Sequence, residues 1–256
     1  ADPREALVAT EPLVVYVRYA DGVALSPGQS SQLEVRLVNP SEGALHGQLI
    51  ARAPDGWIVS GDAHAPDSLQ LDLPAGDEKA VLLAVTPPEG MRVYQNPLDL
   101  RLQFGGFTWT VTAGMVTTLP WRRWRVEALP DACPRMPDDA ELVEAPGHYQ
   151  PLPEGACAFA ADVKVPYPAL IRFVAQAPRA LRVWLDGEQI NEHDGTYCVP
   201  AIHRARHTGS DVQCQRGWHA LTVAVGDGEE GELFVGLGGT NWDWLRDAEW
   251  RDPASE

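Results

Sequence analysis

The chain has 256 residues, 45% of them hydrophobic and 22% charged, so it can bury the core of one large domain or of two ordinary ones. This composition excludes intrinsic disorder as a general description, and no apolar run approaches the ~20 residues of a membrane-spanning helix. Twenty Lys and Arg residues against 36 Asp and Glu residues give a net charge of −16. Because such an acidic protein repels phosphate groups and anionic lipid headgroups, we expect neither nucleic acid nor a membrane as a partner.

In the first half of the chain, apolar and polar residues alternate in short runs, which is the pattern of half-buried β-strands. Between Gln32 and Val38, for example, Leu33, Val35 and Leu37 face one side and the polar residues face the other. Similar strands are predicted at residues 13–19, 47–51, 69–73, 80–85, 98–104 and 107–112, with a hairpin turn at Gly105 and Gly106 between the last two. About seven strands in ~110 residues are typical of an immunoglobulin-like sandwich.

Several motifs of this half follow one another in a defined order. They are Gly28 with the strand Ser30–Asn39, then Pro54, Gly56 and Trp57, then Leu73–Gly76, and finally Val85–Pro88. Over residues 10–118 this order resembles the Ig-like accessory modules that accompany the catalytic domains of glycoside hydrolases. The resemblance implies a sandwich of that type. Trp57 is expected in its core, behind the turn at Asp55 and Gly56.

The strand pattern of the first half ends at Thr118, and Pro120 lacks the N–H group needed to continue a sheet ladder. We therefore predict two domains, an Ig-like β-sandwich at residues 1–118 and a second β-sandwich at residues 119–256. Prolines concentrated after residue 130 predict a long loop or an irregular strand over residues 130–156. Regular strands are then expected at residues 157–165, 169–175, 181–185, 218–225 and 232–237.

Two motifs stand out in the second half. In Arg182–Ile190 a strand reaches a hairpin turn at Asp186 and Gly187, and Gly217–Val225 carries a second alternating strand. Over residues 120–252 these motifs resemble the galactose-binding-like jelly roll, with inward positions at Val183, Leu185, Leu221, Val223 and Val225. That fold serves sugar binding, substrate gating and structural spacing. The predicted fold class is therefore all-β, with two tandem β-sandwiches, Ig-like and then galactose-binding-like jelly roll.

The chain has four cysteines, Cys133, Cys157, Cys198 and Cys214, and an even number suits two disulfides. The simplest pairing joins neighbours in sequence, Cys133 with Cys157 and Cys198 with Cys214, and four reduced thiols are the alternative. Two disulfides would favour an extracellular or periplasmic location.

A metal site is a further alternative for part of this region. Cys198, His203, His207 and Cys214 bring four nitrogen and sulfur ligands within a short segment, as a tetrahedral zinc requires. Their spacing is unfamiliar, however, and Arg204 and Arg206 add positive charge where the dication would sit. A calcium ion held by Asp and backbone oxygens is a second alternative, and the sequence requires no cofactor.

The aromatic residues give the clearest signal for a ligand. Trp242 and Trp244 stand beside Asn241, Asp243 and Arg246, and indole rings stack on the apolar face of a sugar while such polar groups bind its hydroxyls. We therefore predict a saccharide site at these five residues. The alternative is that the two tryptophans pack in a core or between domains.

No catalytic residues are predicted, because the sequence contains neither a nucleophile elbow nor a phosphate-binding loop. The resemblances imply a non-catalytic accessory region of a larger carbohydrate-active or related hydrolase. Its partner would be the catalytic domain of that parent protein or a saccharide. Two alternatives remain open, a purely structural or interaction module and a metal-dependent enzyme that uses the His203 and His207 region.

Overall fold

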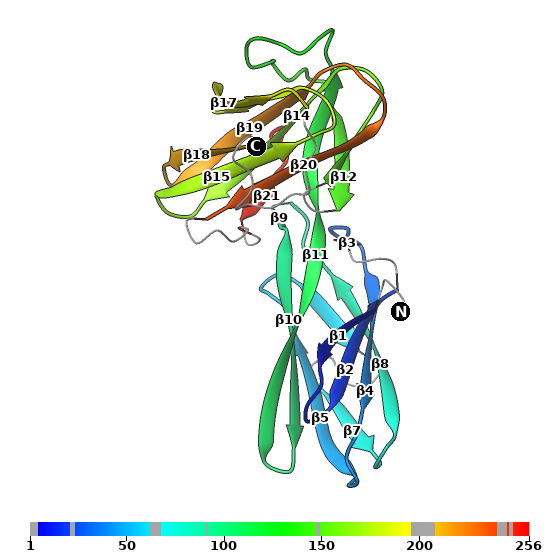
Figure 1. Cartoon of the computed structure of the whole chain (residues 1–256). Coiled ribbons are helices and arrows are strands. Elements are labelled where there is room, and N and C mark those ends of the chain that lie inside the picture. The colour runs from blue at the N-terminus through cyan, green and yellow to red at the C-terminus, as the bar shows by residue number, and fades with distance from the viewer. Residues whose placement is uncertain are drawn as a thin grey trace. The chain divides into compact units, whose positions relative to one another are not determined.

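The computed structural model describes residues 5–20, 24–61, 68–90, 92–146, 149–195, 208–239, 245 and 248–255 (Figure 1). These residues form strands and loops, so the all-β prediction is confirmed. Within the described ranges there is consequently no helix that could cross a membrane. The chain divides into two compact units. The first unit contains Ala1–Glu89 and Gln95–Thr117, and the second contains Gly90–Tyr94 and Thr118–Glu256.

The first unit is a sandwich of two sheets whose neighbouring strands are antiparallel, apart from one short parallel pairing. One sheet has the order β1 (Glu5–Ala9), β2 (Val14–Tyr19), β4 (Ser31–Val38), β8 (Glu78–Thr86) and β6 (Ile58–Gly61). The other has the order β11 (Phe107–Arg125), β10 (Gln95–Phe104), β5 (Leu45–Arg52) and β7 (Leu69–Leu73), and β3 (Ala24–Leu25) pairs with β11 in parallel.

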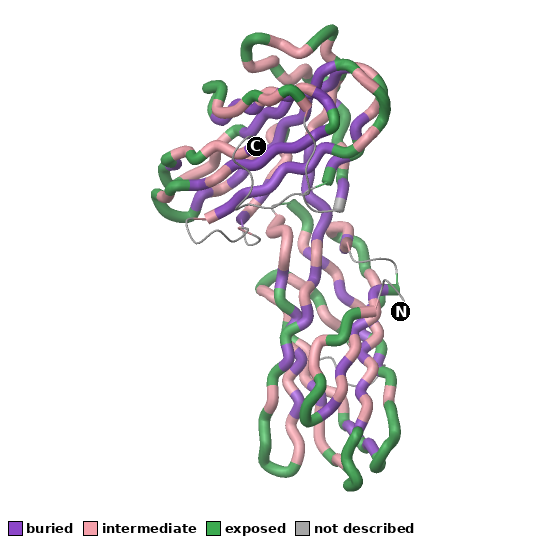
Figure 2. The backbone as a smooth tube through the Cα atoms, in the orientation of Figure 1, coloured by how far each residue is buried: buried purple, intermediate pink, exposed green. Residues whose placement is uncertain are grey.

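The core of the first unit lies between these sheets and follows from the period-two pattern. Leu33, Val35 and Leu37 of β4 are fully buried, and so are Leu100 and Leu102 on β10 of the facing sheet. Along the strands of this unit, buried positions alternate with more exposed ones (Figure 2). Full burial of one such side chain contributes about 1.5–3 kcal/mol. The predicted positions of the strands therefore reflect a real division between a core face and a solvent face.

One local prediction for this unit is confirmed, and a second, that Trp57 lies in the core, holds in part. The turn between β10 and β11 has positive φ at Gly105 (50°) and Gly106 (90°), the region that a primed hairpin turn requires. Trp57 is partly buried and packs against the core.

The second unit is also built from two packed sheets. The larger sheet has the order β17 (Glu188–His193), β16 (Leu181–Leu185), β19 (Gly217–Val225), β14 (Cys157–Val165) and the end of β11. Three further strands join it: β12 (Glu141–Pro146) pairs with β11, and β21 (Glu249–Arg251) pairs with both β14 and β9 (Arg92–Val93). The smaller has the order β13 (Tyr149–Leu152), β20 (Gly231–Gly238), β15 (Ala169–Gln176) and β18 (Gly209–Cys214).

The core of the second unit fills the space between its two sheets. All five inward positions predicted in β16 and β19 belong to it, and so do Phe173 of β15 and Val235 of β20. Trp121 and Trp250 are buried there with their ring centroids 5.6 Å apart. Both tryptophans are therefore core residues of the second unit.

The prediction that the strand ends before Pro120 is wrong. Pro120 lies inside β11, opposite Glu144 of β12. At this position β11 pairs with β12 alone among the described strands, since its pairing with β14 begins at Arg122. In an antiparallel ladder alternate residues direct the N–H group away from a given neighbour, so a strand with one free side tolerates a proline.

Two further segments differ from the sequence prediction. Gly90–Tyr94 belongs to the second unit because β9 pairs with β21, whereas the predicted first domain included it. The segment 130–156, predicted as a long loop or an irregular strand, contains the two strands β12 and β13. Each of these strands pairs with one neighbour in the described structure. Pro146 and Pro151 lack an N–H group, and no hydrogen bond is lost when the missing group would have pointed to the open side of the strand.

The loop after β11 explains why one predicted disulfide is absent. Leu129 and Cys133 of this loop pack against Ala158 and Trp184 on the outer face of the larger sheet. Cys157 precedes Ala158 in β14 and so points to the opposite face, into the main core. Both cysteines are free thiols in the structure, and the predicted Cys133–Cys157 bridge is not formed.

Cys214, the described partner of the second predicted pairing, is also a free thiol in the structure, so the predicted Cys198–Cys214 bridge is not formed either. Cys198 itself lies outside the described residues.

Candidate functional site

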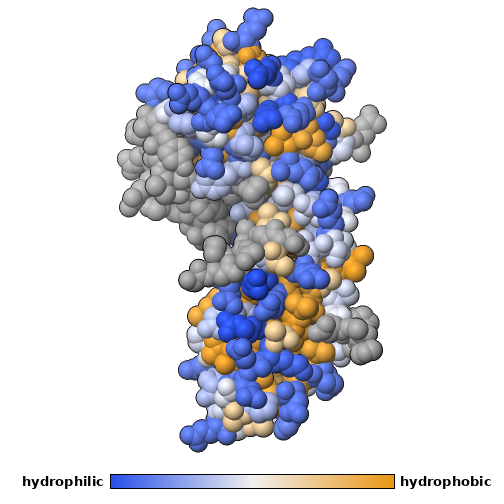
Figure 3. Space-filling view, turned by 90° about the vertical axis from the view of Figure 1, so that its right-hand side faces the viewer, coloured by the Kyte–Doolittle hydropathy of each residue, from blue (hydrophilic) through white to orange (hydrophobic). Residues whose placement is uncertain are grey.

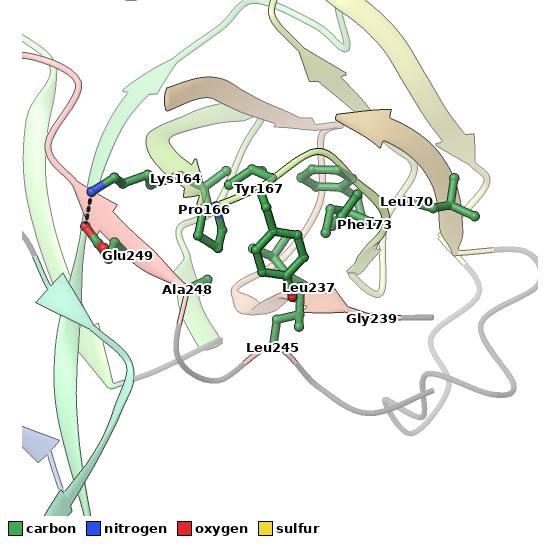
Figure 4. Close-up of a pocket in the computed structure, with 14 residues that line it drawn as sticks. Lys164, Pro166, Tyr167, Leu170, Phe173, Leu237, Gly239, Leu245, Ala248 and Glu249 are labelled. Carbon is green, nitrogen blue, oxygen red and sulfur yellow. Dashed lines mark hydrogen bonds and ion pairs between the residues drawn. The ribbon is translucent and has the colours of Figure 1, made fainter. Parts of the chain in front are cut away.

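A pocket of about 470 Å³ lies at one end of the second unit (Figure 4). Its deep wall is formed by Val163 and Val165 of β14, Ile171 and Phe173 of β15, and Leu237 of β20. These five residues are also members of the main core. The pocket is therefore an opening into the apolar interior of the sandwich.

The mouth of the pocket is set by the turn between β14 and β15. Pro166 follows the last residue of β14 and has no N–H group with which to extend the ladder, so the chain turns here. Tyr167 lies between Pro166 and Pro168 in the turn and is 64% exposed. A large aromatic ring with this exposure, beside an apolar cavity, offers a surface on which a ligand ring can stack.

Lys164 and Glu249 form an ion pair at one side of the pocket, and Leu170 lies at the other side (Figure 4). The Nζ atom of Lys164 lies 2.9 Å from Oε2 of Glu249, and the two side chains are 36% and 29% exposed. They meet because residues 164 and 249 are directly paired in the ladder of β14 and β21. Lys164 lies between Val163 and Val165 in β14, so its charged end leaves the opposite face of the sheet from these two core residues, and the ion pair lies at the edge of the pocket.

Beside this ion pair, the outer face of the larger sheet carries alternating charges around Trp218. Arg251 places its guanidinium 4.4 Å from the centroid of the Trp218 ring and donates a hydrogen bond of 2.9 Å from Nε to Asp162. Lys164 lies 5.7 Å from the same ring centroid. Register again explains the cluster, because Lys164 pairs with Trp218 and Asp162 pairs with Arg251.

A second polar group, formed by Asp186 and His219, stabilises the turn at Asp186. Asp186 has a positive φ of 52°, which Asp tolerates better than most residues, and Gly187 follows it. Nδ1 of His219 lies 2.7 Å from the Asp186 carboxylate, and Nε2 lies 2.9 Å from the carbonyl oxygen of Gln215. Both ring nitrogens therefore face acceptors, and only the protonated imidazolium can donate to both.

This arrangement moves the pKa of His219. Burial on its own would lower the pKa, but the hydrogen bonds to the Gln215 carbonyl and the Asp186 carboxylate outweigh burial and raise the pKa above its ordinary value. In a catalytic pair, Nε2 would face a nucleophile, whereas here it faces a backbone carbonyl. The nearby thiol of Cys214 has a raised pKa because of burial and the Asp186 charge, which disfavours the reactive thiolate. The contacts of Asp186 and His219 are therefore those of a pair that stabilises a turn.

His193 has the opposite environment. Its Nε2 donates to the carbonyl oxygen of Ala175 at 3.0 Å, and its Nδ1 accepts from the backbone N–H of Gly195 at 3.1 Å. The neutral ring satisfies both bonds, and burial lowers the pKa of His193 below its ordinary value.

The residues predicted to bind saccharide, Asn241, Trp242, Asp243, Trp244 and Arg246, all lie outside the described residues. In sequence they surround Leu245 and follow Gly239, and both of these residues line the pocket. The structure brings Tyr167, Lys164 and Glu249 to the same pocket, and the sequence analysis missed all three. The signal that could have indicated Tyr167 is an aromatic residue between two prolines in a turn.

Three of the four proposed zinc ligands, Cys198, His203 and His207, also lie outside the described residues. Across the part of the chain that is described, no three His, Cys, Asp or Glu side chains are grouped so that they could hold a metal ion.

Comparison with known families gives a match in the first unit. Residues 25–105 match the family model described as "NPCBM-associated, NEW3 domain of alpha-galactosidase". This segment is similar to NEW3 domains. The match confirms the resemblance of the first half to accessory modules of glycoside hydrolases, and the NEW3-like segment covers most of the first sandwich. A search of curated proteins finds no match.

Solved structures with similar chain traces have low sequence identity. An anti-sigma factor domain-containing protein is 9% identical over 84% of this chain and 81% of its own, with a TM-score of 0.33. The alfa-L-rhamnosidase of Aspergillus terreus is 13% identical over 90% of this chain and 28% of its own, with a TM-score of 0.28. The lectin of Pleurotus ostreatus in complex with GalNAc is 10% identical over 98% and 85%, with a TM-score of 0.28. At these scores the similarities assign no function to the chain.

Proposed function

We propose that this chain is a non-catalytic accessory region of a larger carbohydrate-active hydrolase, and that its second unit binds a saccharide weakly. The observation that carries the proposal is the match of residues 25–105 to the NEW3 domain of alpha-galactosidase. A module of this kind acts beside a catalytic domain, which is the expected partner. We assign the sugar-binding role to the second unit, which holds the pocket.

The pocket supports the saccharide part of the proposal through its chemistry. Sugar sites combine an aromatic face, on which the C–H side of the ring stacks, with polar groups that bind the hydroxyls. Tyr167 offers the aromatic face, and the Lys164–Glu249 pair adds charged groups at the edge of the pocket. Trp242 and Trp244 are proposed to contribute to the same site, since they fall between Gly239 and Leu245 in sequence.

The test is binding of the intact chain to a glycan array, followed by titration of the best glycan by calorimetry. Tyr167→Ala should weaken binding by about 1–2 kcal/mol, because one exposed aromatic face is lost. Trp242→Ala should weaken it by about 1–3 kcal/mol for the same reason. Phe107→Ala is the matched control, because Phe107 is an 81% exposed aromatic residue of the first unit, and its loss should leave binding unchanged.

Two results would contradict the proposal. Absence of binding to any glycan at millimolar concentration would leave a structural or interaction module. Stoichiometric zinc in the purified protein, together with hydrolytic activity that a chelator removes, would favour the metal-dependent enzyme.

A further inference from the structure

The polar and apolar residues of the pocket are separated by depth. Lys164, Tyr167 and Glu249 are the polar side chains among its lining residues. Tyr167 is exposed, and the ion pair is about one-third exposed, so all three lie where solvent reaches. The deep wall is apolar, with Val163 fully buried and Phe173 and Leu237 each 2% exposed.

This separation limits what can enter. A sugar ring carries hydroxyl groups around its edge, and each hydroxyl that is buried without a partner loses its hydrogen bonds to water. The deep wall has no polar side chain that could replace those bonds. A sugar can therefore find partners at the mouth of the pocket, and the interior suits a group without hydroxyls.

We infer that the pocket binds a glycoside through its apolar aglycone, an aryl or alkyl group that enters the deep wall while the sugar stays at the mouth beside Tyr167. This inference rests on the proposed saccharide-binding function. The cavity of about 470 Å³ lies within the range of ~300–1,000 Å³ that is usual for small-molecule sites, so it accommodates a substituent of this size.

The experiment compares two ligands with the same sugar, p-nitrophenyl β-D-galactoside and methyl β-D-galactoside, by calorimetric titration of the full chain. p-Nitrophenol is the third ligand and carries no sugar. We expect the aryl galactoside to bind at least about tenfold more tightly than the methyl galactoside, since pocket discrimination of even one methylene reaches ~10-fold. p-Nitrophenol should bind more weakly than the aryl galactoside.

A variant that fills the pocket identifies the binding site. Ala169→Leu adds three carbons to a lining residue and should remove the preference for the aryl galactoside while methyl galactoside binding remains. Ala80→Leu is the matched control, because Ala80 lies on an exposed strand position of the first unit. Leu245→Asn, which places an amide in the wall, gives a second test if thermal unfolding shows that Ala169→Leu is misfolded.

The outcomes separate the inference from the proposed function. Equal affinity for the two galactosides would overturn the inference and leave saccharide binding standing. An aryl preference that persists in Ala169→Leu and Leu245→Asn would also overturn it, because the aglycone would bind elsewhere. p-Nitrophenol binding as tightly as its galactoside would overturn the inference, because the sugar would then contribute nothing to binding at this pocket. Absence of binding by every ligand tested would overturn the inference, and absence of binding on the glycan array as well would overturn the proposed function.

Discussion

Arg179 holds three loops together at one end of the second unit. Its side chain is 8% exposed, and Nη1 donates to the carbonyl oxygens of Gly155 (2.8 Å), Gly226 (3.2 Å) and Gly228 (3.2 Å). Nη2 donates to the carbonyl oxygen of Pro153 at 3.0 Å. Four carbonyl acceptors, on the segments before β14 and after β19, thus share one guanidinium. Arg179 itself belongs to the segment after β15.

We predict that Arg179→Leu lowers the free energy of unfolding of the second unit by about 3–5 kcal/mol. A hydrogen bond to a charged group contributes about 1.5–3 kcal/mol net, and a buried acceptor left without a partner costs about 1–3 kcal/mol. The sum over four carbonyls would exceed the prediction. The bonds share one guanidinium and are not additive, and water can enter the cage once the side chain is gone.

Urea unfolding of the intact chain, followed by tryptophan fluorescence, measures this effect. With a slope of about 1–3 kcal/mol per molar urea, the unfolding midpoint of the second unit should fall by more than about 1 M. Arg216→Leu is the control, because Arg216 is exposed in the same unit and its loss should change stability by less than about 0.5 kcal/mol. A change below about 1 kcal/mol in Arg179→Leu would refute the reasoning, since the four contacts would then not stabilise the loops.

Three further predictions concern pH and backbone packing. His219→Gln should destabilise the protein more at pH 5.5 than at pH 8.5, because the pKa of His219 is raised in the folded state. The stabilisation from the protonated ring is complete below the ordinary pKa of 6.5 and is lost as the pH rises through the folded-state pKa. For His193 the sign is reversed, because its lowered pKa gives a stabilisation that is present above pH 6.5 and is lost as the pH falls through the folded-state pKa. His193→Gln should therefore lower the free energy of unfolding more at pH 8 than at pH 5. Equal losses at the two pH values in denaturant titrations would contradict this. Gly47→Ala should destabilise the first unit by about 2 kcal/mol or more, since the added Cβ would lie 1.9 Å from the backbone oxygen of Gln103, whereas Gly43→Ala meets nothing within 4 Å and should leave the thermal midpoint unchanged.

Most of the long strands could be predicted from the sequence, because a strand with one buried face records its burial locally. The alternation of Leu33, Val35 and Leu37 is an example, and β14 and β16 begin and end at the predicted residues. Several short strands were not predicted, β12 and β13 among them. β12 and β13 contain prolines and polar residues, and they form strands because β11 and β20, distant in sequence, offer them open edges.

The candidate site shows the same division. The sequence could indicate that an all-β accessory module was present and that aromatic residues near the C-terminal end were worth testing. It could not place Lys164 beside Glu249, because 85 residues separate them and only the ladder of β14 and β21 brings them together.

Composition and period-two patterning alone determined the all-β class, the core faces of the main strands and the glycine-containing hairpin turns, because each depends on a residue and its near neighbours. Tertiary structure alone decided that β11 continues through Pro120, that Cys133 and Cys157 lie on opposite faces of one sheet, and that the core opens into a pocket beside Tyr167. These features depend on which strands meet, and pairing between distant segments is chosen by the burial of the whole core.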